Sequence, residues 1–366
     1  MTPQHVTESD MRVTWGIGGS WGEGALMRRR GFFAFTAGIM VVAGCGATRT
    51  SGASTANRLS IIAPMAHGQS WDLAVRTLAT VLVEAKLART VGVSNHPGGL
   101  DAATMNTFSA AHGPFMSDGQ LLLTGMPMVA GAEITNAAAV VDSTTPLARL
   151  IGDWAALVVP ANSNLRTFDD FVAVLRRDPA GLVVGGQSTG GSDHVLYGMI
   201  GKCLGVDARL LEYSGYPGWS EAVEALYDGR VAAILGSARS FKKEIAARRM
   251  RPLVVSSGQR IDGIDAPTLM ELEVRLEYSD WCGLLGPRDM RPEDRDAAVA
   301  LCDRLDATPR WQEMCAANGW NRVYLSGEDF RQWLVTETGR TRGVLYDLGL
   351  LKSSSTRCRG GCVKRP

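Results

Sequence analysis

Three loops rich in glycine, serine and threonine hold the residues best suited to binding a small anion. They span residues 64–72, 185–194 and 214–219, and a predicted helix follows each loop. Glycine lets the backbone turn tightly and exposes its N–H groups, and a helix that starts in the turn adds unpaired donors and a partial positive charge. Such loops bind a carboxylate or phosphate without lysine or arginine, and the first two contain neither. For any single loop, ordinary turn and capping chemistry is the alternative explanation.

The candidate ligand-binding residues come from all three loops. Two interpretations of the histidine in the first loop stay open: a solvated loop residue, or a hydrogen-bond donor to the ligand. Asp193 and His194 also suit the first turn of a helix, where the helix dipole favours an acid. The full candidate set is Ala66, His67, Gly68, Ser70, Asp72, Gln187, Ser188, Thr189, Gly191, Ser192, Asp193 and Tyr216.

Residues 186–190 also read G-x-S-x-G, the nucleophile elbow of α/β-hydrolases, with Ser188 as nucleophile. Such an enzyme needs a distant histidine after the serine, yet the last histidine is His194, six residues further on. The histidines lie singly, without metal-ligand spacing, and the mature body has no phosphate or dinucleotide fingerprint. We therefore expect a binding protein with no cofactor or metal, not an enzyme, and hydrolysis is the weaker alternative.

Charge excludes nucleic acid as a partner. Residues 45–351 carry 29 basic and 34 acidic side chains, a net charge of −5. Binding to nucleic acid needs clustered positive charge that neutralises phosphates. Any small anion must therefore be held locally, by backbone dipoles or a single side chain.

The N-terminal region reads as an export signal. Arg28–Arg30 precede 14 uncharged, mostly apolar residues, which are too few for a membrane span of about 20. The run ends in Val-Ala-Gly-Cys45, which resembles a bacterial lipoprotein box, and Arg29-Arg30-Gly-Phe-Phe resembles a twin-arginine signal. A buried helix that ends in cysteine is the alternative, and the choice between general secretory and twin-arginine export stays open.

These features divide the ends of the chain into four segments. Residues 1–26 are interpreted as an upstream misassigned start, 27–44 as a signal peptide, 45–57 as a lipidated flexible tether and 353–366 as a disordered basic tail. Export permits disulfides, and Cys302 and Cys315 are one candidate pair, although buried free thiols are the preferred interpretation.

Short apolar runs alternate with helical periodicity over the rest of the chain. This alternation predicts parallel sheets covered by helices, with binding loops at the carboxyl ends of strands, and the length fits two lobes. A first helix is expected after the first loop, with Leu73, Leu78, Leu82 and Ala85 on one face. The expected strands are 59–63, 91–94, 120–124, 157–159, 182–184, 209–213, 231–235, 253–256 and 281–285, and the later helices are near 167–175, 195–204, 220–227, 241–249, 292–305, 310–317 and 328–345.

Several motifs, in order, resemble those of the solute-binding proteins of tripartite tricarboxylate transporters, the TctC or Bug family. The resemblance covers roughly residues 59–350. The motifs are Pro64-x-x-x-Gly68-x-Ser70-x-Asp72, Asn95-x-Pro97-Gly98, Asp118-Gly119-x-Leu121-Leu122, Gly190-Gly191-Ser192-Asp193-His194, Gly201-Lys202-x-Leu204-Gly205-Val206-Asp207, Trp281-x-Gly283, Asn318-Gly319-Trp320 and Leu325-Ser326-Gly327.

The resemblance implies a type II periplasmic-binding-protein-like α/β fold, with a ligand cleft between two lobes joined by two crossovers. Lobe 1 would comprise 58–156 plus 282–352, and lobe 2 would comprise 157–281. Family members hold a carboxylate largely through backbone amides and waters. By motif position, that role carries over to Ser70, Asp72, Ser188, Thr189 and Ser192.

The implied function is capture of a small carboxylate, such as a di- or tricarboxylate, for the membrane subunits of a tripartite transporter. The protein would be anchored through Cys45 to the outer face of the cytoplasmic membrane. A ligand-sensing lobe for a membrane signalling partner is the alternative. Met65, His67 and Gln69, and Tyr216 and Pro217, depart from the family pattern, which implies a smaller or differently shaped pocket. Citrate is therefore not assumed.

Overall fold

The computed structural model describes residues 55–69, 71–97 and 102–351 of the chain. No helix in these ranges is both long and apolar enough to cross a membrane. Several predicted features lie outside them, namely segments 1–26, 27–44 and 353–366, most of 45–57, Cys45 and Ser70.

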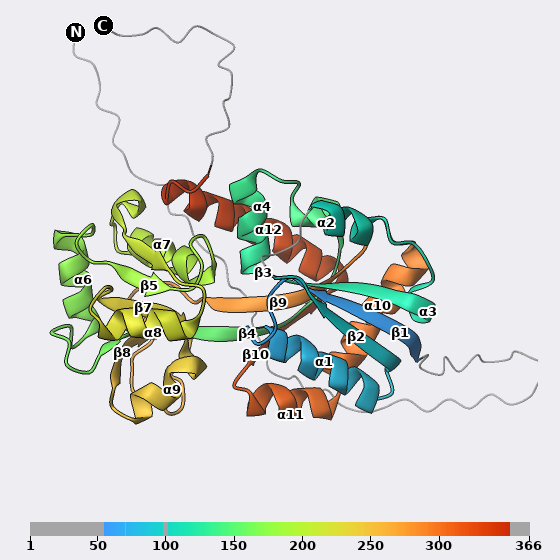
Figure 1. The fold of residues 1–366 in the computed structure, drawn as a ribbon, viewed down its shortest axis with the longest axis horizontal. Coiled ribbons are helices and arrows are strands. Elements are labelled where there is room, and N and C mark those ends of the chain that lie inside the picture. The colour runs from blue at the N-terminus through green and yellow to red at the C-terminus, as the bar shows by residue number, and fades with distance from the viewer. Residues whose placement is uncertain (1–54, 70, 98–101, 352–366) are drawn as a thin grey trace, which may run out of the picture. The chain divides into compact units, whose positions relative to one another are not determined.

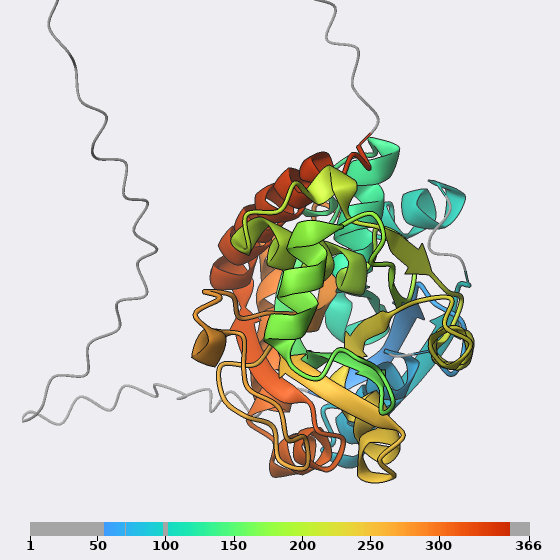
Figure 2. The ribbon, with the colours of Figure 1, turned by 90° about the vertical axis from the view of Figure 1, so that its left-hand side faces the viewer.

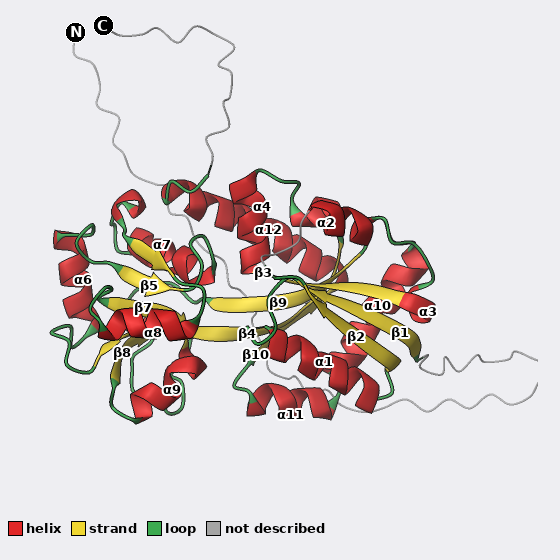
Figure 3. Cartoon of the chain, viewed as in Figure 1, coloured by secondary structure: helices red, strands yellow, loops and turns green. Residues whose placement is uncertain are grey.

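Strands and helices alternate along the chain, as the periodicity predicts (Figure 3). The strands are β1 (Ala56–Ala63), β2 (Ala88–Asn95), β3 (Gly119–Gly125), β4 (Thr145–Pro160), β5 (Val184–Gly186), β6 (Tyr213–Gly215), β7 (Ala233–Ser237), β8 (Met250–Val255), β9 (Ser279–Gly286) and β10 (Asn321–Ser326). The helices are α1 (Asp72–Glu84), α2 (Ala102–Ser109), α3 (Phe115–Asp118), α4 (Met126–Thr135), α5 (Val140–Ser143), α6 (Phe168–Arg177), α7 (Ser192–Cys203), α8 (Trp219–Tyr227), α9 (Ala238–Ala246), α10 (Pro292–Asp306), α11 (Pro309–Ala317) and α12 (Gly327–Asp347).

The strands form one continuous ladder in the order β2-β1-β3-β9-β4-β7-β5-β6 (Figure 1). The 16-residue strand β4 divides this ladder into two halves. Its residues 145–154 pair with β9, and its residues 155–160 pair with β7 and β8. We call the β1–β3, β9 and β10 side the first half and the β5–β8 side the second half. The predicted lobe boundaries fall within β4 and β9 and remain predictions.

The expectation of parallel sheets holds for only some of the strand pairs, because the sheet is mixed. The pairs β1–β2, β1–β3, β5–β6 and β5–β7 are parallel, but β9 is antiparallel to both β3 and β4. The pairs of β4 with β7, β8 and β10 are antiparallel as well. The reason is connectivity, because β4 leads out of the first half and β9 leads back into it. Two such strands that lie side by side must run in opposite directions.

Alternating side chains in the strands build a core on each face of each half. In β3, Leu121 faces the cluster that includes α1, α10 and α11, whereas Leu122 faces the cluster that includes α2, α4 and α12. In β4, Leu157 packs with α6 and α7, whereas Val158 packs with α8 and α9. Helices therefore cover both faces of each half, which leaves the strand ends to carry loops.

Helix α12 contributes to the cores of both halves. Its Phe330 packs with Trp281 in the first half, and its Val344 joins the cluster of α6 and α7 in the second. A helix of 21 residues is about 30 Å long, which is enough to reach both. Figure 2 views the second half end-on, with α6 in front and α12, in red, along one side.

Two local predictions are wrong. The predicted strand at 209–213 is a short 3-10 turn, Ala208–Leu210, followed by β6. The Asp207 carboxylate accepts the Arg209 backbone N–H at 3.1 Å, a side-chain bond that favours a turn over a strand. Leu73 was expected on the buried face of α1, but it is 48% exposed. The thiols of Cys203, Cys282, Cys302 and Cys315 are free.

Candidate functional site

The first loop, at the carboxyl end of β1, is built around Asp72. Its oxygen Oδ2 accepts the Gly68 backbone N–H at 2.9 Å, and Oδ1 accepts Asn95 Nδ2 at 2.7 Å. Gly68 has a φ of +84°, a left-handed conformation that glycine adopts without strain. Ala66 donates its N–H to Gln69 Oε1 at 3.1 Å. Two backbone N–H groups of this predicted anion-binding loop, those of Ala66 and Gly68, thus donate to side chains of the loop itself.

The Asp72 side chain is buried and ionised, and it accepts several hydrogen bonds that hold the first loop together. It is 2% exposed, and Arg76 donates from Nε to Oδ2 at 3.0 Å. Burial acts to raise its pKa, but the bonds from Arg76, Gly68 and Asn95 together lower it to about 2. Both oxygens point at donors of the protein. Direct contact between Asp72 and a ligand therefore remains a prediction, while its role in shaping the loop is visible.

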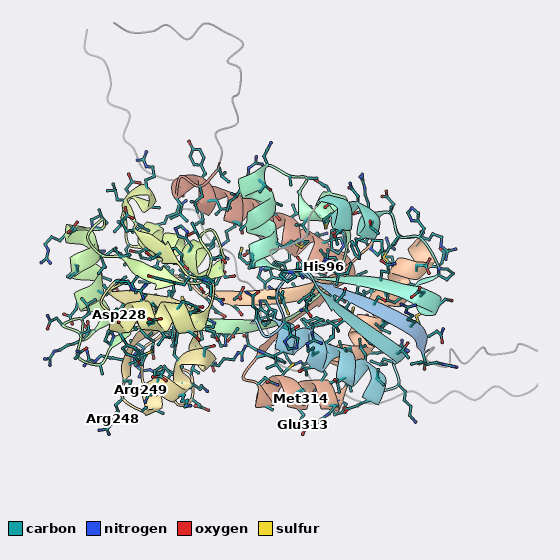
Figure 4. The ribbon with its side chains drawn as sticks, in the orientation of Figure 1. His96, Asp228, Arg248, Arg249, Glu313 and Met314 are labelled. Atoms are coloured by element: carbon teal, nitrogen blue, oxygen red, sulfur yellow. The ribbon has the colours of Figure 1, made fainter. Side chains whose placement is uncertain are left out.

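His67 lies on the outer side of the same loop. Its side chain is 75% exposed, and Nε2 is 3.7 Å from Asp72 Oδ2, beyond hydrogen-bond distance. His96 follows β2 at this end of the strands, where its N–H donates to Ala63 at 2.9 Å (Figure 4). The exposed cations Arg248 and Arg249 follow α9 and lie far from His96 (Figure 4).

The second loop, after β5, is fixed by the first turn of α7. Asp193 Oδ2 accepts the Gln187 N–H at 3.0 Å, and His194 Nδ1 accepts the Gly190 N–H at 3.1 Å. The His194 ring stacks on Tyr213, with centroids 4.2 Å apart. Burial lowers the pKa of His194 to about 4, so the imidazole is neutral and accepts through Nδ1. Since this histidine is committed to the loop, it does not activate Ser188 for hydrolysis.

Several donors of the second loop remain available. Ser188 and Thr189 are exposed, and Gly191 is half-buried. Within the described residues, no acceptor is bonded to the backbone N–H groups of Ser188, Thr189, Ser192 or Asp193. The last two lie at the start of α7, where the helix dipole is positive. This set of groups is the strongest candidate for holding an anionic group.

Ser192 contacts Asp280, a residue that the sequence alone did not single out. Its hydroxyl donates to Asp280 Oδ1 of β9 at 2.5 Å. Asp280 is only partly buried, and the Trp71 indole from the first loop faces it. The carboxyl group therefore lies where the first loop, the second loop and β9 meet. An acid directly before the apolar run 281–286 was the available signal in the sequence.

Asp153 of β4 adds a second strand acid, because the strand register pairs it with Asp280. Asp153 Oδ2 accepts Ser237 Oγ and Arg239 Nε, both at 2.8 Å. Burial raises the pKa of Asp280 to about 7, and the Ser192 bond opposes that rise while the charge of Asp153 adds to it. Burial likewise raises the pKa of Asp193 to about 8, with repulsion from the two strand acids adding to the rise.

The third loop packs against the second loop and against α8 and α9. Tyr216 donates its N–H to Gly186 at 3.0 Å, and its ring packs against the α8–α9 cluster with the Arg230 guanidinium 5.9 Å from its centroid. Contact of Tyr216 with a ligand remains a prediction. Gly215 has a clearer role, because a Cβ there would lie 2.6 Å from Thr189 N. The third loop thus packs closely against the second loop.

A surface cavity lies away from the three glycine-rich loops. It has a volume of about 450 Å³ and lies between the C-terminal ends of α7 and α12, where Lys202, Asp207, Arg209, Tyr346 and Asp347 line it. None of the predicted ligand-binding residues lines it. The described residues also contain no group of histidines, cysteines and acids arranged to hold a metal ion.

Two α/β halves joined by crossing strands, with glycine-rich loops at the strand ends, define a receptor for small solutes. The sequence profile of the tripartite tricarboxylate transporter family receptor, TctC, matches residues 75–350, and the chain belongs to this family. The predicted family is thereby confirmed, as is the expectation of a receptor in place of an enzyme.

Curated relatives match over part of their lengths. The UPF0065 protein in the gbd 5′ region of Cupriavidus necator is 22% identical over 205 residues, 56% of this chain and 62% of that protein. The UPF0065 protein in the tcbD–tcbE intergenic region of Pseudomonas sp. (strain P51) is 31% identical over 137 residues, 37% of this chain and 40% of that protein. The matched part of the chain thus spans less than two thirds of the length of either relative.

Solved structures share the fold over nearly their whole length. A TctC solute-binding protein from Polaromonas has a TM-score of 0.65 at 21% identity and covers 80% of this chain and 99% of its own. Rpa4515 of R. palustris with adipate has a TM-score of 0.66 at 18% identity, covering 80% and 97%. MatC (Rpa3494) from Rhodopseudomonas palustris with bound malate has a TM-score of 0.60 at 17% identity, covering 79% and 99%. The expected type II periplasmic-binding-protein-like fold is confirmed.

Proposed function

We propose that this receptor captures a small carboxylate outside the cytoplasm and delivers it to the membrane subunits of a tripartite transporter. Membership of the transporter receptor family supports this role, as do fold neighbours with malate and adipate. The observation that carries the proposal is the set of available donors at α7. Four backbone N–H groups and the exposed hydroxyls of Ser188 and Thr189 gather there without a lysine or arginine in the loop.

These donors are sufficient for useful affinity. A charge-assisted hydrogen bond contributes about 1.5–3 kcal/mol net. A few such bonds reach micromolar binding, about −8 kcal/mol, after the entropy of association is subtracted. Single Ser188→Ala or Thr189→Ala changes should therefore each weaken binding by about tenfold, without abolishing it.

Capture involves movement about the crossing strands. Ser256 links them, because its Oγ accepts the Ala155 N–H at 2.9 Å and donates to the Tyr278 carbonyl at 2.5 Å. Ala155 lies in β4 where it enters the second half, and Tyr278 lies directly before β9. A ligand held by loops of both halves binds the closed form better and shifts the population toward it. Small-angle scattering should then show compaction on ligand addition.

The receptor is held at the membrane surface through a lipid on Cys45 after cleavage of segment 27–44. The basic cluster, the apolar run and the small residues before Cys45 support this proposal. Intact-mass analysis of the mature protein from membranes should show a diacylglycerol adduct, and Cys45→Ala should release the protein or leave the precursor. A mature wild-type chain without the adduct would contradict the anchor.

A ligand screen tests the central proposal. Thermal shift and isothermal titration should find micromolar binding of C4–C6 mono- and dicarboxylates, with or without an amino group, and no binding of the matching diamides. Gly191→Val should remove most affinity, because its side chain blocks approach to the α7 donors, whereas Ser117→Ala, an exposed serine of α3, should not. Failure of all carboxylates to bind, or unchanged affinity in Gly191→Val, would overturn the proposal.

A further inference from the structure

We propose that Arg239 holds the two halves in the arrangement that binds the solute, and that it thereby controls affinity without touching the ligand. We call Arg239, Asp153 and Trp320 the latch. The inference rests on the proposed function and deepens it, because it names the contact that sets how often the halves lie ready for capture. Scattering from the ligand-free protein tests the latch separately, without an identified carboxylate.

The latch spans both halves of the molecule. Arg239 belongs to the first turn of α9, in the second half. Its Nε donates to Asp153 Oδ2 at 2.8 Å, and Asp153 lies in the part of β4 that pairs with β9. The guanidinium carbon of Arg239 is 5.8 Å from the centre of the Trp320 ring, which is buried in the cluster of α1, α10 and α11. One side chain of the second half therefore contacts two parts of the first half.

The chain segments that carry the latch approach each other closely. Gly319 follows the end of α11 with a φ of +68°, the left-handed conformation that commonly ends a helix. A Cβ at Gly319 would lie 4.0 Å from Arg239 Cβ, so this turn brings Trp320 to the start of α9. Rotation of the second half about the crossing strands β4 and β9 moves α9 relative to this turn. The contact between Arg239 and Trp320 therefore exists only over a narrow range of arrangements.

The contacts of the latch are stronger than those of a surface ion pair. The Asp153 side chain is 7% exposed and that of Arg239 is 24% exposed, so water screens their attraction only in part. Ser237 Oγ donates to the same oxygen of Asp153 at 2.8 Å. Burial raises the pKa of Asp153, and the charge of Arg239 and both hydrogen bonds oppose that rise. A guanidinium within 6 Å of an indole ring adds a cation–π attraction.

The latch is formed in the arrangement that gathers the binding loops. In the same structure Ser192 of the second loop donates to Asp280 of β9, and Trp71 of the first loop faces Asp280. A contact present only in the binding arrangement raises the population of that arrangement. Apparent affinity is proportional to this population, so loss of the latch should weaken every carboxylate by a similar factor.

Small-angle scattering and isothermal titration of the full chain test the latch. Ligand-free Arg239→Gln should have a larger radius of gyration than wild type. Its affinity for succinate, malate and adipate should fall by about three- to tenfold, by a similar factor for each, and saturating ligand should restore the wild-type radius. Arg239→Lys keeps the charge beside Asp153 and should recover part of the affinity. Arg249→Gln is the matched control, because Arg249 donates to Glu244 at 2.7 Å within the second half and should leave both measurements unchanged.

The double variant Arg239→Gln/Asp153→Asn separates a lost latch from an unpaired charge. It lacks the ion pair and the Trp320 contact but leaves no buried carboxylate without its arginine. The latch predicts that the double variant stays expanded and binds weakly.

Two outcomes would overturn the inference. The first is a ligand-free radius of gyration that neither Arg239→Gln nor the double variant changes. The second is recovery of wild-type radius and affinity in the double variant, which would mean that the unpaired charge of Asp153 caused the effect. In both cases the wild type still binds its carboxylate, so the proposed function would stand. Failure of the wild type to bind any carboxylate would refute the proposed function, and the ligand-free scattering would still decide whether the latch exists.

Discussion

Replacing Asp72 with asparagine tests whether the first loop is organised by one buried charge. The carboxylate accepts Gly68 N–H, Arg76 Nε and Asn95 Nδ2 with its two oxygens. An amide of the same shape keeps one acceptor oxygen and turns an NH₂ group toward existing donors. The Asp72→Asn variant therefore keeps the volume of the site and removes both the charge and part of the hydrogen bonding.

The size of the effect follows from the pKa of Asp72, which lies at about 2 in the folded protein against an ordinary 3.8. At 1.36 kcal/mol per pKa unit, the ionised group contributes about 2 kcal/mol to folding, reduced somewhat by the partly exposed arginine partner. The folded pKa lies below the unfolded one. The contribution is therefore complete above about pH 5 and is lost as pH falls from there toward 2.

Urea unfolding followed by tryptophan fluorescence measures this directly at pH 7, 5 and 3. We expect Asp72→Asn to be destabilised by about 2 kcal/mol at pH 7 and the difference from wild type to shrink at pH 3. Asp289→Asn is the control, because that side chain is 82% exposed and should change stability little. Equal stability of the two variants at pH 7, or a difference that does not vary with pH, would refute the reasoning.

Three further predictions concern packing and thiols. Gly236→Ala should lower stability by about 1–3 kcal/mol, because the added methyl group would overlap the Trp219 ring, and an unchanged melting temperature would contradict this packing. Ser256→Ala should cost about 1–3 kcal/mol in urea unfolding, because it leaves a buried N–H of β4 unpaired, and wild-type stability would argue against the link. In native protein, a thiol reagent followed by peptide mapping should label exposed Cys203 but not Cys302, which is buried and has its pKa raised by burial to about 12, and labelling of both would contradict the fold there.

Features encoded by neighbouring residues were predictable from the sequence. The predicted helix near 167–175 begins with a capping box: Thr167 Oγ1 accepts the Asp170 N–H at 3.1 Å, and Asp170 Oδ2 accepts the Thr167 N–H at 3.0 Å. The first and second loops likewise lie between strands and helices as expected. These signals depend on residues three or four positions apart, so the sequence alone contains them.

Features set by distant partners were not predictable in the same way. The direction of β9 depends on its pairing with β3 and β4, more than 100 residues earlier in the chain. The expected strand at 157–159 covers only the last part of β4. Residues 145–154 are extended because they pair with β9 and β10, which lie far away in the sequence. Asp280 was missed for the same reason, since only the tertiary fold brings Ser192 and Trp71 to it.

The conspicuous acids of the two loops fix the backbone of those loops. A loop that binds an anion through backbone N–H groups gains affinity only if those groups are already fixed, because ordering them on binding costs entropy. Asp72 fixes Gly68, and Asp193 fixes Gln187, each by accepting an N–H that would otherwise leave the loop loose. Their removal should therefore weaken every ligand by a similar factor. Asp280 accepts the Ser192 hydroxyl, so it links the start of α7 to β9 and helps to fix the same donors.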